Sequence, residues 1–366
     1  MDGSQFPAQQ FISGEILEIK PLSGGHIHHT YLVKEATPSG ARSLVLQRMN
    51  HHVFTKPQEV INNMKLVSAH IAKFLDPNDD FCIFDIIPTL KGPLLYLDNG
   101  GYSWRMLTFI DGSYTLDYVQ LPKQAYEGAL AYGKFLSLIA EMETTEIAET
   151  IPNFHHLGYR YEGFSKACKE DNNNRVAQVP NEVAFVKERV PFVQRIMELV
   201  TGGTLPSRVV HNDTKLNNVL FSKRTDHGIS VVDWDTIMPG YLMYDFGDMV
   251  RTFTSPLPED SRELSSVAVQ LPVFQALCEG FIKALHPILT ASEKNSLLIG
   301  SQLMTFIMGL RFLTDYLEGD IYYQIDYPSH NLDRCRNQFH LLLSLEEQDA
   351  KLRKILDQIV LSYRDR

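Results

Sequence analysis

The 366-residue sequence contains few cysteines and no excess of basic residues. Its four cysteines are Cys82, Cys168, Cys278 and Cys335, and no two of them form a Cys-x-x-Cys motif. We therefore expect reduced thiols, as in a cytoplasmic protein, rather than a disulfide framework. The formal net charge is −10, so we expect neither nucleic acid nor an anionic membrane as a partner.

The sequence also lacks long apolar runs, internal repeats and low-complexity linkers. No run approaches the ~18 apolar residues of a membrane span, and the N-terminus lacks the basic and apolar regions of a signal peptide. The composition, 44% hydrophobic and 21% charged, is typical of a globular protein. The length allows two lobes with a substantial core, and we expect a monomer or a weak dimer.

A polar loop and two short apolar runs occupy residues 208–235. The apolar runs, 219–221 and 229–232, flank a polar segment with Asp226 and Gly228, which predicts a β-hairpin. An antiparallel hairpin brings its outer ends together, so Asn218 and Asp233 should lie close to each other. An amide oxygen and a carboxylate form a hard oxygen site that suits Mg²⁺.

The same stretch has the spacing of a kinase catalytic loop, His-x-Asp-x-x-x-x-Asn followed by a metal-binding Asp. The matching residues are His211, Asp213, Asn218 and Asp233. Asp213 is the candidate base, and Lys215 is placed to reach the transferred phosphate. An ordinary polar loop is the alternative, but four residues of the right type in one hairpin favour the kinase interpretation.

Residues 245–247 spell Asp-Phe-Gly, the metal-binding motif of protein kinases. No β-strand is predicted directly before Asp245, whereas residues 229–232 lead directly into Asp233. We therefore interpret Asp233 as the metal ligand, and Asp245 as a carboxylate that supports the catalytic loop or caps a helix.

Upstream, Gly24 and Gly25 lie between two β-prone stretches and predict a hairpin turn that covers nucleotide phosphates. An ordinary turn is the alternative. The strand predicted at residues 43–49 carries Gln47 where kinases usually have a phosphate-binding lysine. Pro57 begins a predicted helix that extends to about residue 75, and no glutamate lies at its centre, so the lysine–glutamate pair of kinases is missing as a unit.

Two further strands are predicted at 84–97 and 102–110, joined by an Asp-Asn-Gly-Gly turn. We interpret residues 108–112 as a hinge between the lobes, where the backbone of Thr108 and Ile110 would bind adenine; a plain strand end is the alternative. Most of the remaining chain has helical patterns, at 123–142, 180–200, 272–286, 292–316 and 332–364. These patterns predict an α+β protein with a small β-rich lobe at 1–110 and a larger helical lobe at 111–366.

Several blocks of sequence resemble the aminoglycoside phosphotransferase and choline kinase family of small-molecule kinases, and within it the N-acetylhexosamine 1-kinase branch. These blocks are 25–27 (GHI) with 30–33 (TYLV), 210–218 (VHNDTKLNN), 235–240 (DTIMPG), 245–248 (DFGD), and 309–313 (GLRFL) with 315–322 (DYLEGDIY). The catalytic loop is specific only to kinases in general, and the last three blocks carry the closer likeness.

This resemblance implies a two-lobed protein-kinase-like fold. It also implies that ATP, with Mg²⁺, phosphorylates the anomeric hydroxyl of N-acetylglucosamine or N-acetylgalactosamine. His26, Arg311 and Tyr322 would then contact the sugar. Two alternatives remain open at this stage: a kinase of the same fold for another sugar or an amino alcohol, and a catalytically dead nucleotide-binding protein, which the missing lysine at Gln47 would suit.

Overall fold

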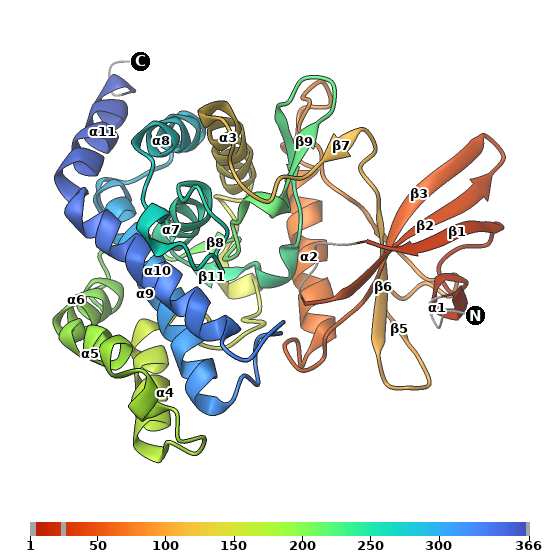
Figure 1. Ribbon diagram of the computed structural model, residues 1–366. Coiled ribbons are helices and arrows are strands. Elements are labelled where there is room, and N and C mark those ends of the chain that lie inside the picture. The colour runs from red at the N-terminus through yellow and green to blue at the C-terminus, as the bar shows by residue number, and fades with distance from the viewer. Residues whose placement is uncertain (1–4, 23–26, 364–366) are drawn as a thin grey trace.

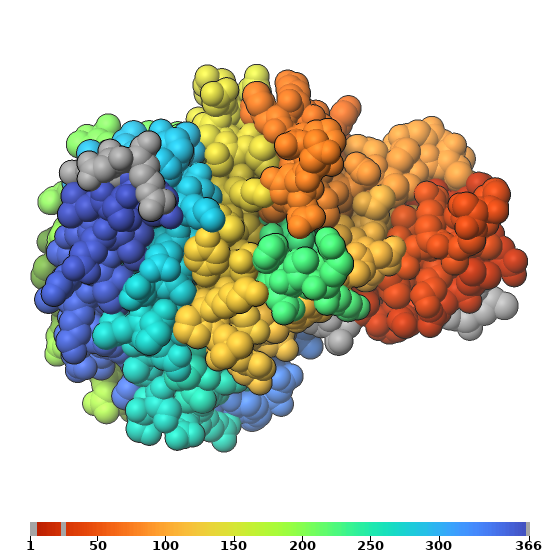
Figure 2. All heavy atoms as spheres, turned by 90° about the horizontal axis from the view of Figure 1, so that it is seen from above, coloured from red at the N-terminus to blue at the C-terminus, as the bar shows by residue number. Residues whose placement is uncertain are grey.

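The structure is a computed structural model that describes residues 5–22 and 27–363. It has two lobes, a sheet-rich N-terminal lobe and a larger helical lobe (Figure 1). Figure 2 shows the same division on the surface, with N-terminal residues (red and orange) at one end and C-terminal residues (blue) at the other. The fold class predicted from the sequence is therefore confirmed.

The N-terminal lobe is an antiparallel sheet of order β1-β2-β3-β6-β4, with β5 also paired to β6. The short helix α1 (Gln5–Ala8) precedes it. The strands are β1 (Ile16–Pro21), β2 (His29–Thr37), β3 (Gly40–Arg48), β4 (Ile86–Ile87), β5 (Tyr96–Leu97) and β6 (Ser103–Thr108). Strands β1 and β2 form the predicted hairpin, although Gly24, Gly25 and His26 at its turn lie outside the described residues.

Helix α2 (Pro57–Ile71) lies between the sheet and the helical lobe (Figure 1). Proline at its first position has no N–H to leave unsatisfied, which favours a helix start there. The predicted apolar face of Val60, Met64, Val67 and Ile71 is buried. Asn63 on α2 donates to the carbonyl oxygens of Ala148 (2.8 Å) and Ile237 (3.0 Å), so this helix is anchored to the other lobe.

The helical lobe contains two small sheets and most of the helices. The sheets have the orders β10-β9-β7 and β11-β8. Their strands are β7 (Ser113–Tyr114), β8 (Arg208–Val210), β9 (Val219–Ser222), β10 (Gly228–Val231) and β11 (Met238–Gly240). The helices are α3 (Pro122–Leu138), α4 (Leu157–Glu170), α5 (Pro180–Glu188), α6 (Val190–Thr201), α7 (Leu242–Phe253), α8 (Leu271–Leu285), α9 (Ala291–Glu318), α10 (His330–Glu347) and α11 (Asp349–Ser362).

The hairpin predicted at the catalytic loop is confirmed. Strands β9 and β10 pair antiparallel with Val231 opposite Val219, and the N–H of Val232 donates to the carbonyl oxygen of Asn218 at 2.9 Å. Asp226 in the turn has a φ of 58°, a left-handed conformation that aspartate tolerates better than most residues. Asn218 and Asp233 therefore lie at the same end of the hairpin.

Three predicted elements are interrupted. The strand predicted at 84–97 is only β4 and β5, because Pro88 and Pro93 between them have no N–H for a sheet. The helix predicted at 180–200 is divided into α5 and α6 beside Pro191, which lacks a helical donor. The helix predicted at 332–364 is divided at Gln348, whose side chain donates to the carbonyl oxygen of Val269 at 3.2 Å.

Helix α9 runs through the helical lobe and is long and apolar enough, by composition, to cross a membrane. In the described part of the chain it is the one helix of this kind, and 83% of its most apolar window is buried inside the protein. Helices α7 and α9 approach so closely that a Cβ added at Gly247 would lie 2.2 Å from the carbonyl oxygen of Gly300. Helix α9 is thus a core helix of this lobe.

Candidate active site

The backbone of the loop before β9 is held by Asp245, which lies in the first turn of α7. Its two carboxylate oxygens accept from the N–H groups of His211 (2.8 Å) and Asn212 (2.7 Å). Its carbonyl oxygen accepts from the hydroxyl of Thr214 at 2.6 Å. Burial raises the pKa of Asp245 to about 7, although the two N–H donors lower it. Asp245 therefore supports the loop, as expected, and both of its oxygens are occupied.

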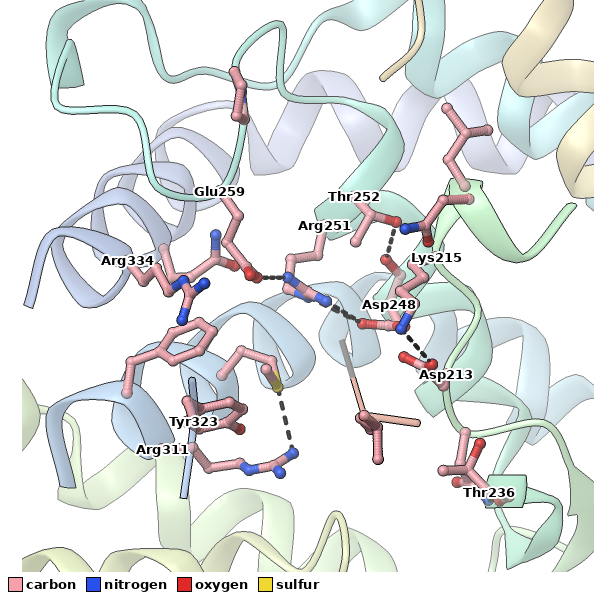
Figure 3. Close-up of a pocket in the computed structure, with 18 of the residues that line it drawn as sticks. Asp213, Lys215, Thr236, Asp248, Arg251, Thr252, Glu259, Arg311, Tyr323 and Arg334 are labelled. Carbon is pink, nitrogen blue, oxygen red and sulfur yellow. Dashed lines mark hydrogen bonds and ion pairs between the residues drawn. The ribbon is translucent and has the colours of Figure 1, made fainter. Parts of the chain in front are cut away.

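Asp213 and Lys215 lie side by side beyond this support (Figure 3). The Asp213 carboxylate accepts from the Lys215 ammonium at 2.8 Å and from the Asn218 amide at 3.0 Å. Burial alone would raise the pKa of Asp213, but the charge and hydrogen bond of Lys215 lower it below its usual value. The negative charges of Asp213 and Asp233 in turn raise the pKa of Lys215 well above its usual range, although burial lowers it. Asp213 is therefore ionised and oriented at neutral pH.

Asn218 and Asp233 provide the oxygens for a cation. The amide nitrogen of Asn218 donates to the backbone and side-chain oxygens of Asp213, both at 3.0 Å, which leaves its amide oxygen for another partner. The Asp233 carboxylate has no hydrogen-bond or ion-pair partner among the described residues, and burial raises its pKa. One amide oxygen and one unpaired carboxylate fit Mg²⁺.

His28, Asp233 and Asp235 also bring possible metal-ligating atoms within 4.8 Å of one another. Asp235, however, is already engaged: it accepts from His28 and from both terminal nitrogens of Arg105, one of them at 2.9 Å. Arg105 and His28 hold the pKa of Asp235 well below its usual range despite its burial. Asp233 is therefore the carboxylate of this group that remains free for a cation.

A cavity of about 370 Å³ lies between the lobes, bounded by the N-terminal sheet and by the β9–β10 hairpin. Gln47, Thr108 and Ile110, which the sequence placed at the nucleotide, line this cavity, as do Asn218 and Asp233. The N–H of Thr108 donates to the carbonyl oxygen of Asp85 at 2.9 Å. The N–H of Ile110 has no partner in the part of the chain that the structure describes, so it is available as a hydrogen-bond donor to a ligand in this cavity.

A second cavity of about 320 Å³ lies on the Asp213 side of the loop, and Lys215 and Asn217 line both cavities. Helices α7 and α9 and the segment after α9 form its walls (Figure 3). Arg311 and Tyr322, predicted to contact the acceptor, both line it. The two cavities therefore meet where a phosphoryl group would pass from donor to acceptor.

Five residues that line the second cavity each have a buried side-chain polar atom with no hydrogen-bond partner within residues 5–22 and 27–363. These atoms are His155 Nδ1, Asn217 Oδ1, Asp248 Oδ2, Tyr323 Oη and Gln338 Oε1. The ring Nε2 of His155 faces the carbonyl oxygen of Asn212 at 2.9 Å and so carries the proton. Burial lowers the pKa of His155 to about 3, which leaves Nδ1 as an acceptor. Several side chains around this cavity therefore have acceptor atoms that no protein group within the described residues satisfies.

The charged groups of this cavity are mostly paired with one another. Arg251 lies between Asp248, which it contacts at 2.8 and 3.0 Å, and Glu259 (Figure 3). Arg311 has no carboxylate partner among the described residues. It lies over the rings of Phe154 (4.9 Å), Tyr323 (5.6 Å) and Tyr322 (5.7 Å), so its charge is available to a ligand.

The positions of Asp248 and His155 in the second cavity, and of the Arg105–Asp235 pair beside the first, were not predicted from the sequence. An arginine in the middle of an apolar strand was a usable signal for the pair, because a buried guanidinium requires an anionic partner. Asp235, two residues after the predicted metal ligand, was a candidate for that partner. Asp248 and His155 had no comparable signal, since only the tertiary structure brings them to the cavity.

Several solved structures share the fold of this chain. An aminoglycoside phosphotransferase from Alicyclobacillus acidocaldarius matches with a TM-score of 0.61 at 12% identity, covering 96% of this chain and 95% of that one. A choline kinase from Cryptosporidium parvum gives 0.60 at 12% identity, with coverages of 97% and 98%. The GDP complex of an aminoglycoside 2'-phosphotransferase-IIIa gives 0.59 at 11% identity, with coverages of 93% and 99%. At these identities the structures show a shared fold alone.

A family model adds evidence at the level of sequence. The model described as the phosphotransferase enzyme family matches residues 18–272, which include the N-terminal sheet, the catalytic loop and α7. This range is well over half of the chain and contains Asp213, Lys215, Asn218 and Asp233, whereas the wall of the second cavity from Met308 to Gln338 lies outside it. The chain therefore belongs to the phosphotransferase enzyme family.

Proposed function

We propose that this phosphotransferase transfers the γ-phosphoryl group of ATP to the anomeric hydroxyl of an N-acetylhexosamine, N-acetylglucosamine or N-acetylgalactosamine, to give the sugar 1-phosphate. The nucleotide occupies the cavity lined by Gln47, Thr108 and Ile110, and the sugar occupies the cavity lined by Arg311 and Tyr322. Asp213 lines the sugar cavity and is paired with Lys215, which lines both cavities.

The observation that carries the proposal is that five residues lining the acceptor cavity each have a polar atom without a partner among the described residues. Leaving a buried polar group unsatisfied costs about 1–3 kcal/mol, so a ligand that satisfies several of them gains both affinity and orientation. A sugar carries several hydroxyl groups, each of which donates one hydrogen bond. The acceptors His155 Nδ1, Asn217 Oδ1, Asp248 Oδ2 and Gln338 Oε1 match such a ligand.

The charge of the cavity supports a neutral acceptor over a cationic one. Among the described residues, four acidic and four basic side chains line it, namely Asp117, Asp213, Asp248 and Glu259 against Lys215, Arg251, Arg311 and Arg334. An ammonium acceptor requires an anionic or aromatic cage, and the unpaired charge of Arg311 over the aromatic wall opposes it. Arg311 suits an acetamido or hydroxyl oxygen instead.

In the proposed reaction, Asp213 orients the anomeric hydroxyl and accepts its proton, while Lys215 neutralises charge on the transferred group. The Asn218 amide keeps the Asp213 carboxylate in place through its 3.0 Å hydrogen bond. When bound by Asn218 and Asp233, Mg²⁺ supplies charge neutralisation for the β- and γ-phosphates. Phosphoryl transfer depends mainly on positioning and charge, so it does not require a strong base. The lowered pKa of Asp213 is therefore compatible with its proposed role.

The test is an ATP-consumption assay with Mg²⁺ and a panel of acceptors: the two N-acetylhexosamines, glucose, galactose, choline and homoserine. Phosphorus NMR then identifies the phosphorylated position. An anomeric phosphate on an N-acetylhexosamine is the expected product. Turnover with choline or homoserine alone would replace the sugar by an amino alcohol, in keeping with the choline kinase that shares the fold. No turnover with any acceptor would favour a protein that only binds nucleotide.

A further inference from the structure

The described lining of the nucleotide cavity holds few groups that can carry positive charge. They are His28, Arg105 and Lys215, against one carboxylate, Asp233. Lys215 is paired with Asp213 at the acceptor side, and His28 is bound to Asp235. A nucleoside triphosphate brings several negative charges into this space, so a permanent cation on its sheet side is needed beyond the metal ion.

The guanidinium of Arg105 lies on that side. Arg105 on β6 pairs directly with Gln47 on β3 in the antiparallel sheet, so the two side chains are on the same face. Its Nε donates to Gln47 Oε1 at 2.9 Å, and its terminal nitrogens donate to Asp235 and, at 3.2 Å, to Met64 Sδ. Four of its five N–H groups are thus used, and one on Nη2 has no partner among the described residues.

The ion pair between Arg105 and Asp235 resembles the lysine–glutamate pair of kinases, but it lies on other elements of the fold. Kinases place a lysine on the strand equivalent to β3 and its glutamate partner on the adjacent helix. Here β3 carries Gln47, and α2 presents Met64 at the guanidinium. The cation has moved to the neighbouring strand as Arg105, and its carboxylate partner is Asp235, in the short turn after β10.

Glutamine at position 47 is compatible with an arginine at position 105, whereas the usual lysine is not. A lysine at position 47 would face Arg105 across adjacent strands, where like charges destabilise a pair. Glutamine instead offers an acceptor oxygen to Arg105, and its amide nitrogen donates to the hydroxyl of Thr30 at 3.3 Å. The orientation of the guanidinium is therefore set from both lobes, by Gln47 on one side and by Asp235 on the other.

We propose that Arg105 is the phosphate-binding cation of this kinase and holds the α- and β-phosphates of the nucleotide in place of the missing lysine. Arg105 lines the nucleotide cavity, and although Asp235 offsets much of its charge, its remaining N–H on Nη2 is the donor that we assign to a phosphate oxygen. The inference rests on the kinase function proposed above, but it concerns the nucleotide and is independent of the acceptor.

The test is calorimetric titration of ADP and of adenosine, each with Mg²⁺, into the wild type and two variants. Arg105→Met should weaken ADP binding by about 10- to 100-fold and leave adenosine affinity within about twofold. Arg48→Met is the matched control, because Arg48 is the neighbour of Gln47 on β3 and stacks over Tyr102 at 4.6 Å, away from the cavity. It should leave both affinities unchanged.

The ratio of ADP to adenosine affinity separates phosphate binding from a structural role, which would weaken both ligands equally. An unchanged ratio in Arg105→Met overturns the inference. If that variant fails to fold, Arg105→Lys and Arg105→Gln provide the same comparison, since lysine keeps the charge and glutamine keeps a hydrogen-bond donor for Asp235. Only the glutamine variant should then lose ADP affinity selectively. A wild type that binds neither ADP nor ATP would instead refute the kinase proposal.

Discussion

Gly247 is the glycine of the Asp-Phe-Gly sequence, which in protein kinases is a metal-binding motif. In this structure it instead packs α7 against α9, and a substitution there tests how that packing positions the site. It lies in the middle of α7, and a Cβ at this position would meet the carbonyl oxygen of Gly300 at 2.2 Å and Met304 Cγ at 2.8 Å. The nearest atom is backbone on α9, which cannot rotate away. We expect Gly247→Ala to force the two helices apart.

The magnitude follows from two opposing effects. Overpacking a well-packed core typically costs about 1–3 kcal/mol, and the backbone contact at Gly247 places this site at the upper end. Alanine regains about 1 kcal/mol of helix propensity over glycine. The free energy of unfolding should therefore fall by about 2 kcal/mol. Because α7 also carries Asp245, which holds the N–H groups of His211 and Asn212, kcat should fall as well.

The assay is urea unfolding of the purified variants, with Gly163→Ala as the control. Gly163 lies in α4, and a Cβ there would meet nothing within 4 Å. This variant should gain up to about 1 kcal/mol, so the two alanine variants should differ by about 3 kcal/mol. A Gly247→Ala protein as stable as Gly163→Ala would refute the packing role of Gly247.

Three further predictions concern the site itself. Asp213→Asn should lower kcat by about 10²- to 10⁴-fold without changing ATP affinity. The control, Asp357→Asn on the exposed face of α11, should match the wild type. Near-normal turnover of Asp213→Asn would exclude the proposed role of Asp213. Asp315 accepts from the N–H groups of residues 321, 322 and 323 at 2.7–3.0 Å, so Asp315→Ala should raise KM for the acceptor about tenfold or more and leave KM for ATP unchanged. The folded pKa of Asp213 is below its usual value, so its base form persists as pH falls towards 4. The His155 pKa of about 3 keeps that ring neutral, so a limb in the profile of kcat/KM near pH 7 at saturating MgATP should come from the Asp245 carboxyl, whose pKa is about 7.

Local signals predicted the catalytic hairpin well. The polar spacing of residues 211–218 and the two apolar runs after it depend on neighbours in sequence, and the hairpin was found where expected, with Asn218 and Asp233 at the same end of it. The buried face of α2 was predictable for the same reason, because a 3.6-residue period is a local property. The proposed roles of these residues in catalysis remain to be tested by the variants above.

Other features depend on contacts between distant segments and were not predictable in this way. The division between α10 and α11 occurs at Gln348, with no proline or glycine there, and accompanies a hydrogen bond to Val269, 79 residues away. Asp245 was expected either to support the loop or to cap a helix, and only its contacts with His211 and Asn212 decided between the two. The wall of the acceptor cavity comes from segments of the chain that no local pattern connects.

The sequence by itself determined that this chain carries the polar groups of phosphoryl transfer at the end of one hairpin, because those residues lie within 23 positions of one another, from His211 to Asp233. Only the tertiary structure decided how the missing lysine is replaced. Arg105 and Asp235 are 130 residues apart, and a buried charge finds its partner through the packing of the two lobes. The same packing brings His155, Asp248 and Tyr323 to the acceptor cavity from three distant segments of the chain, which no local pattern connects.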